Sequence, residues 1–305
     1  MSFFPGKDPA LGDAHASDAI EQVIVPRSID LGDFRVHRAL PTAEPRMVGP
    51  FILFDHAGPA VLRAGNGVAV RPHPHIGLAT VTYLFEGEVV HRDSLGTAMP
   101  IQPGAVNLMI AGRGIVHSER SAPERRASAD KLHGLQLWVA LPAASEEAAP
   151  VFAHTSAADI PKLCENGMTL RVILGTMHRL RSPAATSWDT LFADAHLKAG
   201  TGLPVDAEHE ERAIYVLAGD IEIGGERYGP EQLLVLRPGD PVFVRAVSDA
   251  HIAVIGGAAM DGPRHIWWNF VSSRQERIEA AKADWKAGRF DVVPGDTVEF
   301  IPLPS

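Results

Sequence analysis

The sequence is poor in cysteine and in long apolar segments. Cys164 is the single cysteine among 305 residues, which excludes an internal disulfide framework and a zinc cage built from thiolates. No apolar run approaches about 18 residues, so no membrane-spanning helix is expected. Residues 1–20 lack the basic segment followed by an apolar segment that is typical of a secretory signal. These absences together predict a cytoplasmic protein with no membrane partner.

Positive charge is also scarce. The chain has 28 Lys and Arg residues against 37 Asp and Glu residues, a net charge of −9, and its basic residues form no long run. Most of such a surface would repel a nucleic-acid phosphate backbone. We therefore expect no direct nucleic-acid binding, and any regulatory role would have to act through a protein partner.

Glycine and proline, in contrast, are abundant. Their 28 and 24 residues disfavour a helical bundle and favour short strands joined by tight turns. Short segments of alternating apolar and polar residues, bounded by turn-forming residues, predict strands. These segments are residues 68–70, 80–85, 106–110, 135–140, 214–217, 233–236 and 251–255. The fold class expected from this pattern is all-β.

One helix is predicted late in the chain, over residues 274–287. Ser273 is its expected N-cap, with Glu276 three residues later, and Gly288 follows its expected end. An apolar stripe along this helix is expected to pack on a sheet. The stripe consists of Ile278, Ala281 and Trp285.

A faint internal repeat indicates two β domains. Tyr-Leu-Phe-Glu-Gly at residues 83–87 has its counterpart, about 132 residues later, in Tyr-Val-Leu-Ala-Gly at residues 215–219, and a Pro-Gly turn follows each copy. This spacing is too long for a solenoid, whose repeats span about 20–50 residues. An Ala-, Glu- and Pro-rich stretch at 143–150 is the expected linker. The predicted domains are therefore residues 1–145 and residues 146–305.

Two short motifs in the first domain carry metal-binding chemistry. His73 and His75 share one face of a strand, as do His117 and Glu119, because strand side chains alternate. If the two strands are neighbours, three imidazoles and one carboxylate converge. Such a set binds one divalent transition metal (Fe, Mn, Co, Ni, Cu or Zn), and its lack of sulfur argues against a structural zinc. Iron is the first choice, with coordination positions left for dioxygen or a bidentate substrate.

The alternative is that these motifs are structural. A lone His-x-His is more often a surface or structural feature, but two such motifs with matching strand parity favour a shared metal site. The second domain offers a comparison, because Ile252 and Val254 occupy the positions that match His117 and Glu119. His209 and Glu211 share parity there without a complementary pair. The second domain is therefore expected to lack a metal.

The remaining histidines carry weaker signals. His56 precedes a turn that would return toward the barrel mouth, which makes it a candidate neighbour of the metal site. His91, His133 and His265 are expected to be structural or surface residues.

Four segments resemble the pirin family of the cupin superfamily. They are Arg-Pro-His-Pro-His-Ile-Gly at 71–77, Tyr-Leu-Phe-Glu-Gly at 83–87, His-Arg-Asp-Ser-Leu-Gly at 91–96 and Ala-Gly-Arg-Gly-Ile-Val-His-Ser-Glu at 111–119. The resemblance implies a bicupin, in which two antiparallel β-barrel (jelly-roll) domains face each other, here with a C-terminal helix. It also implies a single metal, usually iron, in the N-terminal domain. The implied ligands are His73, His75, His117 and Glu119.

The resemblance also implies a function. Several pirins resemble quercetin 2,3-dioxygenases, which open the central ring of a flavonol with dioxygen and release carbon monoxide. The broader cupin pattern has an acidic residue shortly after His-x-His, but residues 77–81 contain none, so Glu119 would supply the only carboxylate ligand. Glu119 would also act as a general base. The partners expected for a monomeric enzyme are a small aromatic substrate such as a flavonol, and O2. The alternatives are a non-enzymatic, redox-responsive co-regulator that binds a protein, and a cupin enzyme for another enol or diketone.

Overall fold

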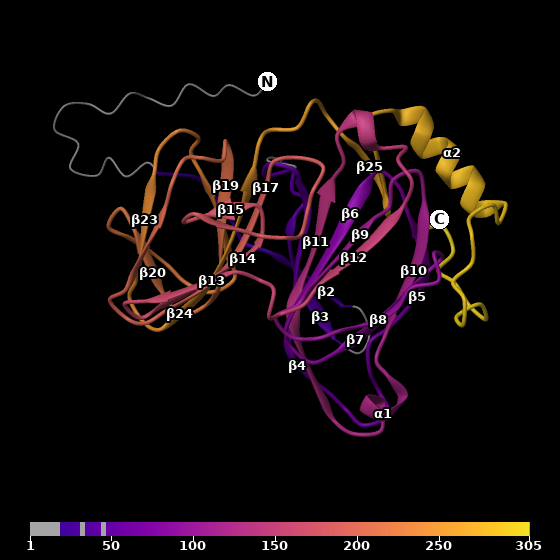
Figure 1. Ribbon diagram of the computed structural model, residues 1–305, viewed down its shortest axis with the longest axis horizontal. Coiled ribbons are helices and arrows are strands. Elements are labelled where there is room, and N and C mark those ends of the chain that lie inside the picture. Colours follow the sequence, from indigo (N-terminus) through magenta and orange to yellow (C-terminus); the bar gives the residue numbers. More distant parts are fainter. Residues whose placement is uncertain (1–18, 31–33, 44–46, 305) are drawn as a thin grey trace.

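The computed structural model describes residues 19–30, 34–43 and 47–304, and antiparallel sheets dominate in them (Figure 1). Two domains lie side by side, and each packs a large sheet against a smaller one. The all-β prediction with a C-terminal helix is confirmed. The prediction that no secretory signal is present rests almost entirely on residues outside this description.

Both sheets of the N-terminal domain are antiparallel. In spatial order, the described strands of its larger sheet are β12 (Val151–Thr155), β9 (Val106–Ile110), β6 (Leu78–Glu86), β11 (Asp130–Ala140), β4 (Phe51–Leu62), β3 (Arg35–Leu40) and β2 (Arg27–Asp30). Those of its smaller sheet are β5 (Ala69–His75), β10 (Ile115–Arg120), β7 (Val89–Asp93) and β8 (Ala98–Ile101).

The C-terminal domain repeats this arrangement. The described strands of its larger sheet are β1 (Ile20–Ile24), β22 (Gln232–Leu236), β19 (Glu211–Ala218), β24 (Ala250–Gly257), β17 (Thr190–Leu197), β14 (Met168–Leu174) and β13 (Lys162–Glu165). Those of its smaller sheet are β18 (Gly202–Val205), β23 (Val242–Ala246), β20 (Ile221–Ile223) and β21 (Glu226–Tyr228). The short elements are the hairpins β15 (Thr176–Met177) with β16 (Leu180–Arg181) and β25 (His265–Trp267) with β26 (Phe270–Ser272), the 3-10 helix η1 (Ala143–Ser145), and the helices α1 (Pro123–Arg126) and α2 (Gln275–Lys286).

The strand segments expected from alternation match these elements. Six of the seven lie inside strands, and residues 68–70 overlap the start of β5. Neither helix in the part of the chain that the structure describes is long and apolar enough to cross a membrane.

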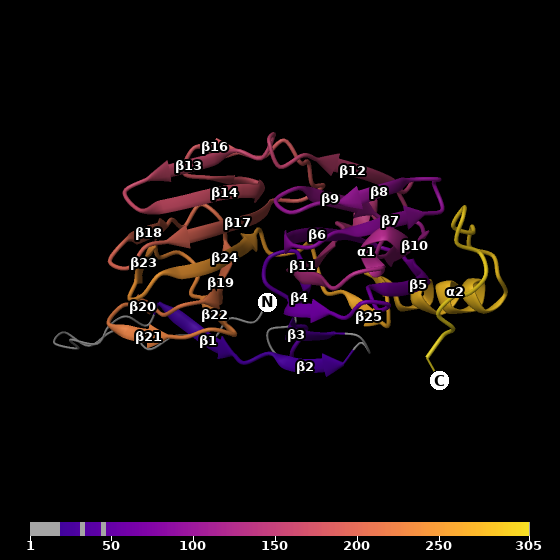
Figure 2. The ribbon, with the colours of Figure 1, turned by 90° about the horizontal axis from the view of Figure 1, so that it is seen from below.

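The two domains exchange edge strands. β1, from the start of the chain, pairs with β22 of the C-terminal domain, whereas β12, which follows the linker, pairs with β9 of the N-terminal domain (Figure 2). Each large sheet thus contains one strand from the other side of the predicted boundary between residues 145 and 146. That boundary stays a prediction.

The two larger sheets face each other across an apolar interface. Tyr83 on β6 packs edge-on against Phe192 on β17, with ring centroids 5.6 Å apart, and Phe54 on β4 lies 4.7 Å from Tyr215 on β19. Odd-numbered side chains of β6 face this interface, and even-numbered ones face the interior of the N-terminal barrel. Strand alternation thus assigns one face to domain packing and leaves the other for the site.

The interior of the C-terminal barrel is aliphatic. Ile252 and Val254, which correspond to the His-x-Glu positions of the first domain, are fully buried there among residues such as Leu170, Leu191 and Ile214. These side chains offer no donor atoms to a metal.

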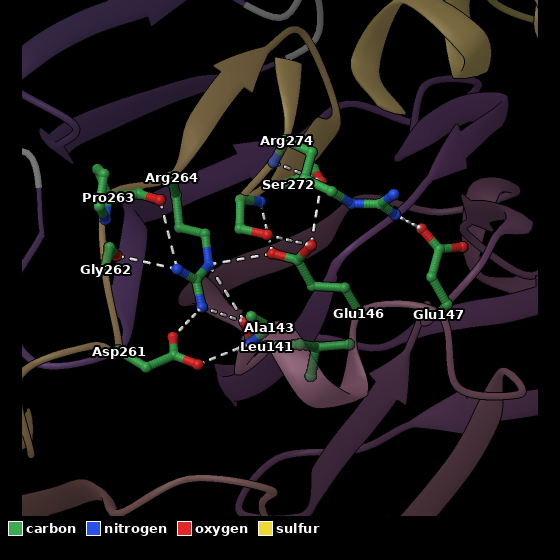
Figure 3. Close-up of polar contacts among 11 residues, drawn as sticks. Leu141, Ala143, Glu146, Glu147, Asp261, Gly262, Pro263, Arg264, Ser272 and Arg274 are labelled. Carbon is green, nitrogen blue, oxygen red and sulfur yellow. Dashed lines mark hydrogen bonds and ion pairs between the residues drawn. The ribbon is translucent and has the colours of Figure 1, made fainter. Parts of the chain in front are cut away.

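A buried ion pair joins the linker to the C-terminal segment (Figure 3). Arg264 Nε lies 3.2 Å from Glu146 Oε1, and the two side chains are 1% and 2% exposed. The Arg264 guanidinium also donates to the carbonyls of Leu141, at 2.8 Å, and Gly262, at 2.9 Å, and pairs with Asp261. Every arm of this arginine is therefore occupied, so a buried charge is fully compensated.

The predicted N-cap of the C-terminal helix is wrong. Arg274 occupies the N-cap position of α2 without a side-chain cap, and the hydroxyl of Ser273 donates to Glu146 Oε2 at 3.0 Å instead. A carboxylate brought in by the linker competes for this hydroxyl, and it also accepts the Ser273 backbone N–H at 2.6 Å. Local spacing could not reveal a partner 127 residues away.

The remaining helix predictions are confirmed. Ile278 and Ala281 are fully buried against Phe270 and Ile76, and Trp285 packs at the edge of the same cluster. Gly288 has φ +66° directly after the helix, a conformation that glycine adopts without the steric cost of a Cβ. The helix therefore packs on the hairpin of β25 and β26, and β26 in turn contacts β5, which carries the His-x-His motif (Figure 1).

Candidate metal centre

The two histidine motifs lie on neighbouring strands. β5 and β10 pair antiparallel, with His117 directly opposite His73. β5 is an edge strand of its sheet, and an edge tolerates Pro72 and Pro74, which lack the N–H that a central strand needs. The convergence expected from strand parity therefore occurs for the three histidines.

The three imidazoles form a compact, buried cluster. His75 Nε2 lies 3.0 Å from His117 Nε2, and the ring centroids of His73 and His117 are 4.4 Å apart. One nitrogen from each of the three rings lies within 4.8 Å of the others. The side chains are 7% exposed or less, so little water competes for these nitrogens.

Burial keeps these histidines neutral. Desolvation lowers the pKa of His73 to about 4, and it lowers the pKa values of His75 and His117 well below the ordinary value, with further lowering from the neighbouring imidazoles. His73 Nδ1 donates to the carbonyl of Arg71 at 2.8 Å, so its Nε2 keeps a free lone pair. A neutral imidazole with a free lone pair is the form that binds a metal.

Glu119 lies beside this cluster and is not part of it. A β-bulge separates it from His117 in the pairing with β5, and its carboxylate is not among the mutually close donor atoms. Its Oε1 is 3.5 Å from the Thr82 hydroxyl, which donates to Gln136 Oε1 at 2.9 Å. Desolvation raises the pKa of Glu119, which makes its carboxylate a stronger base than an exposed one.

Two further residues, not expected from the sequence, orient the cluster. His91 is buried, with its Nδ1 3.4 Å from His117 Nδ1 and its Nε2 3.0 Å from Asp93 Oδ2. Although burial opposes it, hydrogen bonds from His91 and Thr97 lower the pKa of Asp93, which is therefore ionised and accepts a hydrogen bond from His91 Nε2. With the His91 proton on Nε2, its Nδ1 is placed to accept from His117 Nδ1, an arrangement that leaves His117 Nε2 free. The signal that could have revealed this pair is its i, i+2 spacing on β7.

Two other histidines considered from the sequence, His56 and His209, have their contacts outside this cluster. His56 is not near it, because its Nε2 contacts His133 Nε2 at 3.0 Å and its Nδ1 contacts the Tyr215 hydroxyl at 3.2 Å, at the domain interface. His209 binds Asp189 and the carbonyl of Thr176. His56 shares the interface side of β4 with Phe54, two residues earlier, and both rings contact that of Tyr215.

The burial of His56 predicts a pH-dependent stability. Desolvation, and secondarily His133, lower its pKa to about 3 from the ordinary 6.5, so the unfolded chain takes up this proton at a higher pH than the folded one. The stabilisation is therefore complete above pH 6.5 and is lost as the pH falls toward 3. Between pH 7.5 and 5 we expect His56 to account for a loss of about 2 kcal/mol in the free energy of unfolding.

Urea unfolding at the two pH values measures this loss. Between pH 7.5 and 5, the free energy of unfolding of His56→Gln should fall by about 2 kcal/mol less than that of the unmodified protein. His265→Gln, at an exposed position, should show the same fall as the unmodified protein. The same drop in all three proteins would contradict the assignment.

Comparisons with known proteins agree with this architecture. Residues 33–139 match the Pirin family model, and residues 192–291 match the Pirin C-terminal cupin domain. A pirin-like protein of Caulobacter vibrioides is 44% identical over 94% of this chain and 100% of its own length. A Pseudomonas aeruginosa protein with the provisional name quercetin 2,3-dioxygenase is 36% identical over 93% of this chain and 90% of its own.

A solved structure supports the same relationship. The quercetin 2,3-dioxygenase of Acinetobacter baumannii superposes with a TM-score of 0.86 and 31% identity, over 93% of this chain and 95% of that one. Both halves of the chain, the bicupin fold and these relatives lead to one conclusion. The chain belongs to the pirin family.

Proposed function

We propose that this protein is a metal-dependent dioxygenase of the quercetin 2,3-dioxygenase type, which opens the central ring of a flavonol with O2. The observation that supports this most directly is the cluster of three buried, neutral histidines beside a carboxylate of raised pKa. Three nitrogen ligands without sulfur are typical of catalytic metal sites, whereas structural zinc sites are closed by four ligands that usually include cysteine. The names of two similar proteins point to the same chemistry.

His73, His75 and His117 would hold the metal through nitrogen atoms, and Glu119 would approach as an additional ligand. Nitrogen and oxygen donors without sulfur suit iron, our first choice, and also Mn, Co, Ni, Cu or Zn. When bound, the metal supplies Lewis-acid and redox chemistry next to open coordination positions.

The protein itself supplies a base and an orienting frame. Glu119 would accept the proton of the flavonol 3-hydroxyl at a carboxylate oxygen. Trp138 lies edge-on to His75, with ring centroids 5.1 Å apart, and contributes an apolar aromatic wall. An aromatic substrate would pack on such a wall.

Replacing Glu119 with glutamine tests the base. Because glutamine keeps the shape of the side chain and loses its basicity, flavonol turnover should fall at least about 100-fold while the iron content changes less than about twofold. The measurement is quercetin loss and carbon monoxide release after anaerobic loading with Fe(II). Glu165→Gln, which alters an exposed carboxylate on β13, is the matched control and should keep full activity.

The outcomes discriminate between the functions. Equal turnover in Glu119→Gln and the unmodified protein would contradict the base role. Iron without any turnover of flavonols in the unmodified protein would contradict the quercetinase proposal, and would favour a co-regulator or an enzyme for another enol or diketone. A cytoplasmic location and a monomeric state stay predictions.

A further inference from the structure

A second group of metal-binding side chains lies between the domains, outside both barrel interiors. Asp194 and His196 share one face of β17, two residues apart, and His251 on β24 is directly opposite His196. One donor atom from each of the three lies within 4.8 Å of the other two. This face of the sheet is turned toward the N-terminal domain, because Tyr83 of β6 donates its hydroxyl to Asp194 Oδ2 at 3.1 Å.

Asp194 is held in place by its neighbours. It is 3% exposed, and the Tyr83 hydroxyl donates to it. His251 Nε2 lies 2.6 Å from Asp194 Oδ1. Arg171 is opposite Asp194 in the register of β14 and β17, but its guanidinium donates to the carbonyls of Gly104 and Ala157. The carboxylate is thus oriented by two hydrogen-bond donors.

His196 gives the group an open side. Its side chain is exposed, whereas Asp194 and His251 are buried. The rings of His196 and His251 stack, with centroids 3.9 Å apart and planes 17° apart. A metal ion must lie near the plane of each imidazole that binds it, so the exposed ring would turn about its side-chain torsions to complete the site.

The structure of this group leads us to propose a second metal site, formed by Asp194, His196 and His251, for a borderline divalent cation such as Zn2+. Two imidazoles and one carboxylate suit Zn2+, Co2+ or Ni2+, whereas Mg2+ and Ca2+ require mostly oxygen ligands. Binding of the ion would release to solvent the proton that lies between His251 Nε2 and Asp194 Oδ1, and water on the side of His196 would complete the coordination. His251 is the buried end of the site, packed against Phe85 of the N-terminal domain with ring centroids 4.6 Å apart.

The position of the site gives the bound ion a role at the domain interface. Asp194 contacts Tyr83 and His251 contacts Phe85, and both partners lie on β6. An ion that binds the folded protein and not the unfolded one raises the stability of the arrangement that forms its site. The cation is therefore expected to reinforce the docking of the two domains.

Zinc binding to variants of the full chain tests this site. In His117→Ala, which disrupts the N-terminal cluster, calorimetric titration of metal-depleted protein with Zn2+ should still show about one equivalent per chain. Adding His196→Gln should weaken this binding more than about 100-fold, because loss of a ligand costs more than the 10–100-fold typical of its supporting partners. Since His196 is exposed, this change does not disturb the core. His117→Ala with His265→Gln is the matched control and should keep the full affinity.

Two further readouts make the result specific to this geometry. Co2+ bound to His117→Ala should give the visible absorption of a low-coordinate cobalt ion, and this signal should vanish in the double variant with His196→Gln. Zn2+ should also raise the melting temperature of His117→Ala and leave that of the double variant unchanged. Absence of the zinc equivalent in His117→Ala, or equal zinc affinity with and without His196, would overturn the proposal.

Discussion

Replacing His117 with alanine is expected to weaken Fe(II) binding at the N-terminal cluster by more than about 100-fold. His117 lies close to both other members of the cluster: its ring is 4.4 Å from that of His73 and 4.9 Å from that of His75. Residues that only hold a metal ligand in position change metal affinity about 10–100-fold, so removal of the ligand itself should exceed this range. His73→Ala should have an effect of the same size.

The experiment is a competition titration of Fe(II) under anaerobic conditions. All proteins should carry His196→Gln, so that the interdomain group does not contribute to the measured binding. His265→Ala is the control, because this histidine is exposed and lies outside both histidine groups. Since alanine leaves a cavity, His117→Gln should accompany it, and near-UV circular dichroism should verify that both variants are folded. Unchanged iron affinity in folded His117 variants would show that the cluster is not the iron site.

Replacing Arg264 with alanine is expected to lower the free energy of unfolding by about 3–5 kcal/mol. The change leaves Glu146 buried at 2% exposure without its cation, and it removes donors from the carbonyls of Leu141 and Gly262 (Figure 3). The hydrogen bonds from Ser273 to Glu146 remain, but they bring no positive charge to offset the desolvation cost of a buried carboxylate. Because the same segment continues into Phe270, which packs beside Ile76 after the His-x-His motif, loosening it should also expose the metal cluster.

The matched control is Arg274→Ala, at an exposed ion pair that Figure 3 also shows. Arg274 pairs with Glu147 at 2.9 Å, but these side chains are 51% and 46% exposed. Arg274→Ala should therefore cost less than about 1 kcal/mol, since water screens an exposed pair. Urea unfolding of both variants provides the comparison, and equal destabilisation by the two changes would contradict the role assigned to the buried pair.

The metal cluster could be predicted because its rule is local. In a strand, residues i and i+2 always share a face, so His73 with His75 had to point the same way, whatever the rest of the chain did. The same rule applied to His91 and Asp93 would have revealed the pair that orients His117. It could not tell whether Glu119 joins the histidines, because a bulge in the pairing with β5 changes the local geometry.

What the sequence by itself determined is the all-β class, the repeat of two β domains and the face on which each histidine motif projects. These follow from turn-forming residues and from side-chain alternation, which act over a few neighbouring positions. Only the tertiary structure decided that β1 and β12 change domains, that Ser273 binds Glu146 in preference to capping a helix, and that Asp194 and His251 meet Tyr83 and Phe85. The physical reason is that such contacts depend on which distant surfaces bury their apolar area together, and no local pattern specifies that choice.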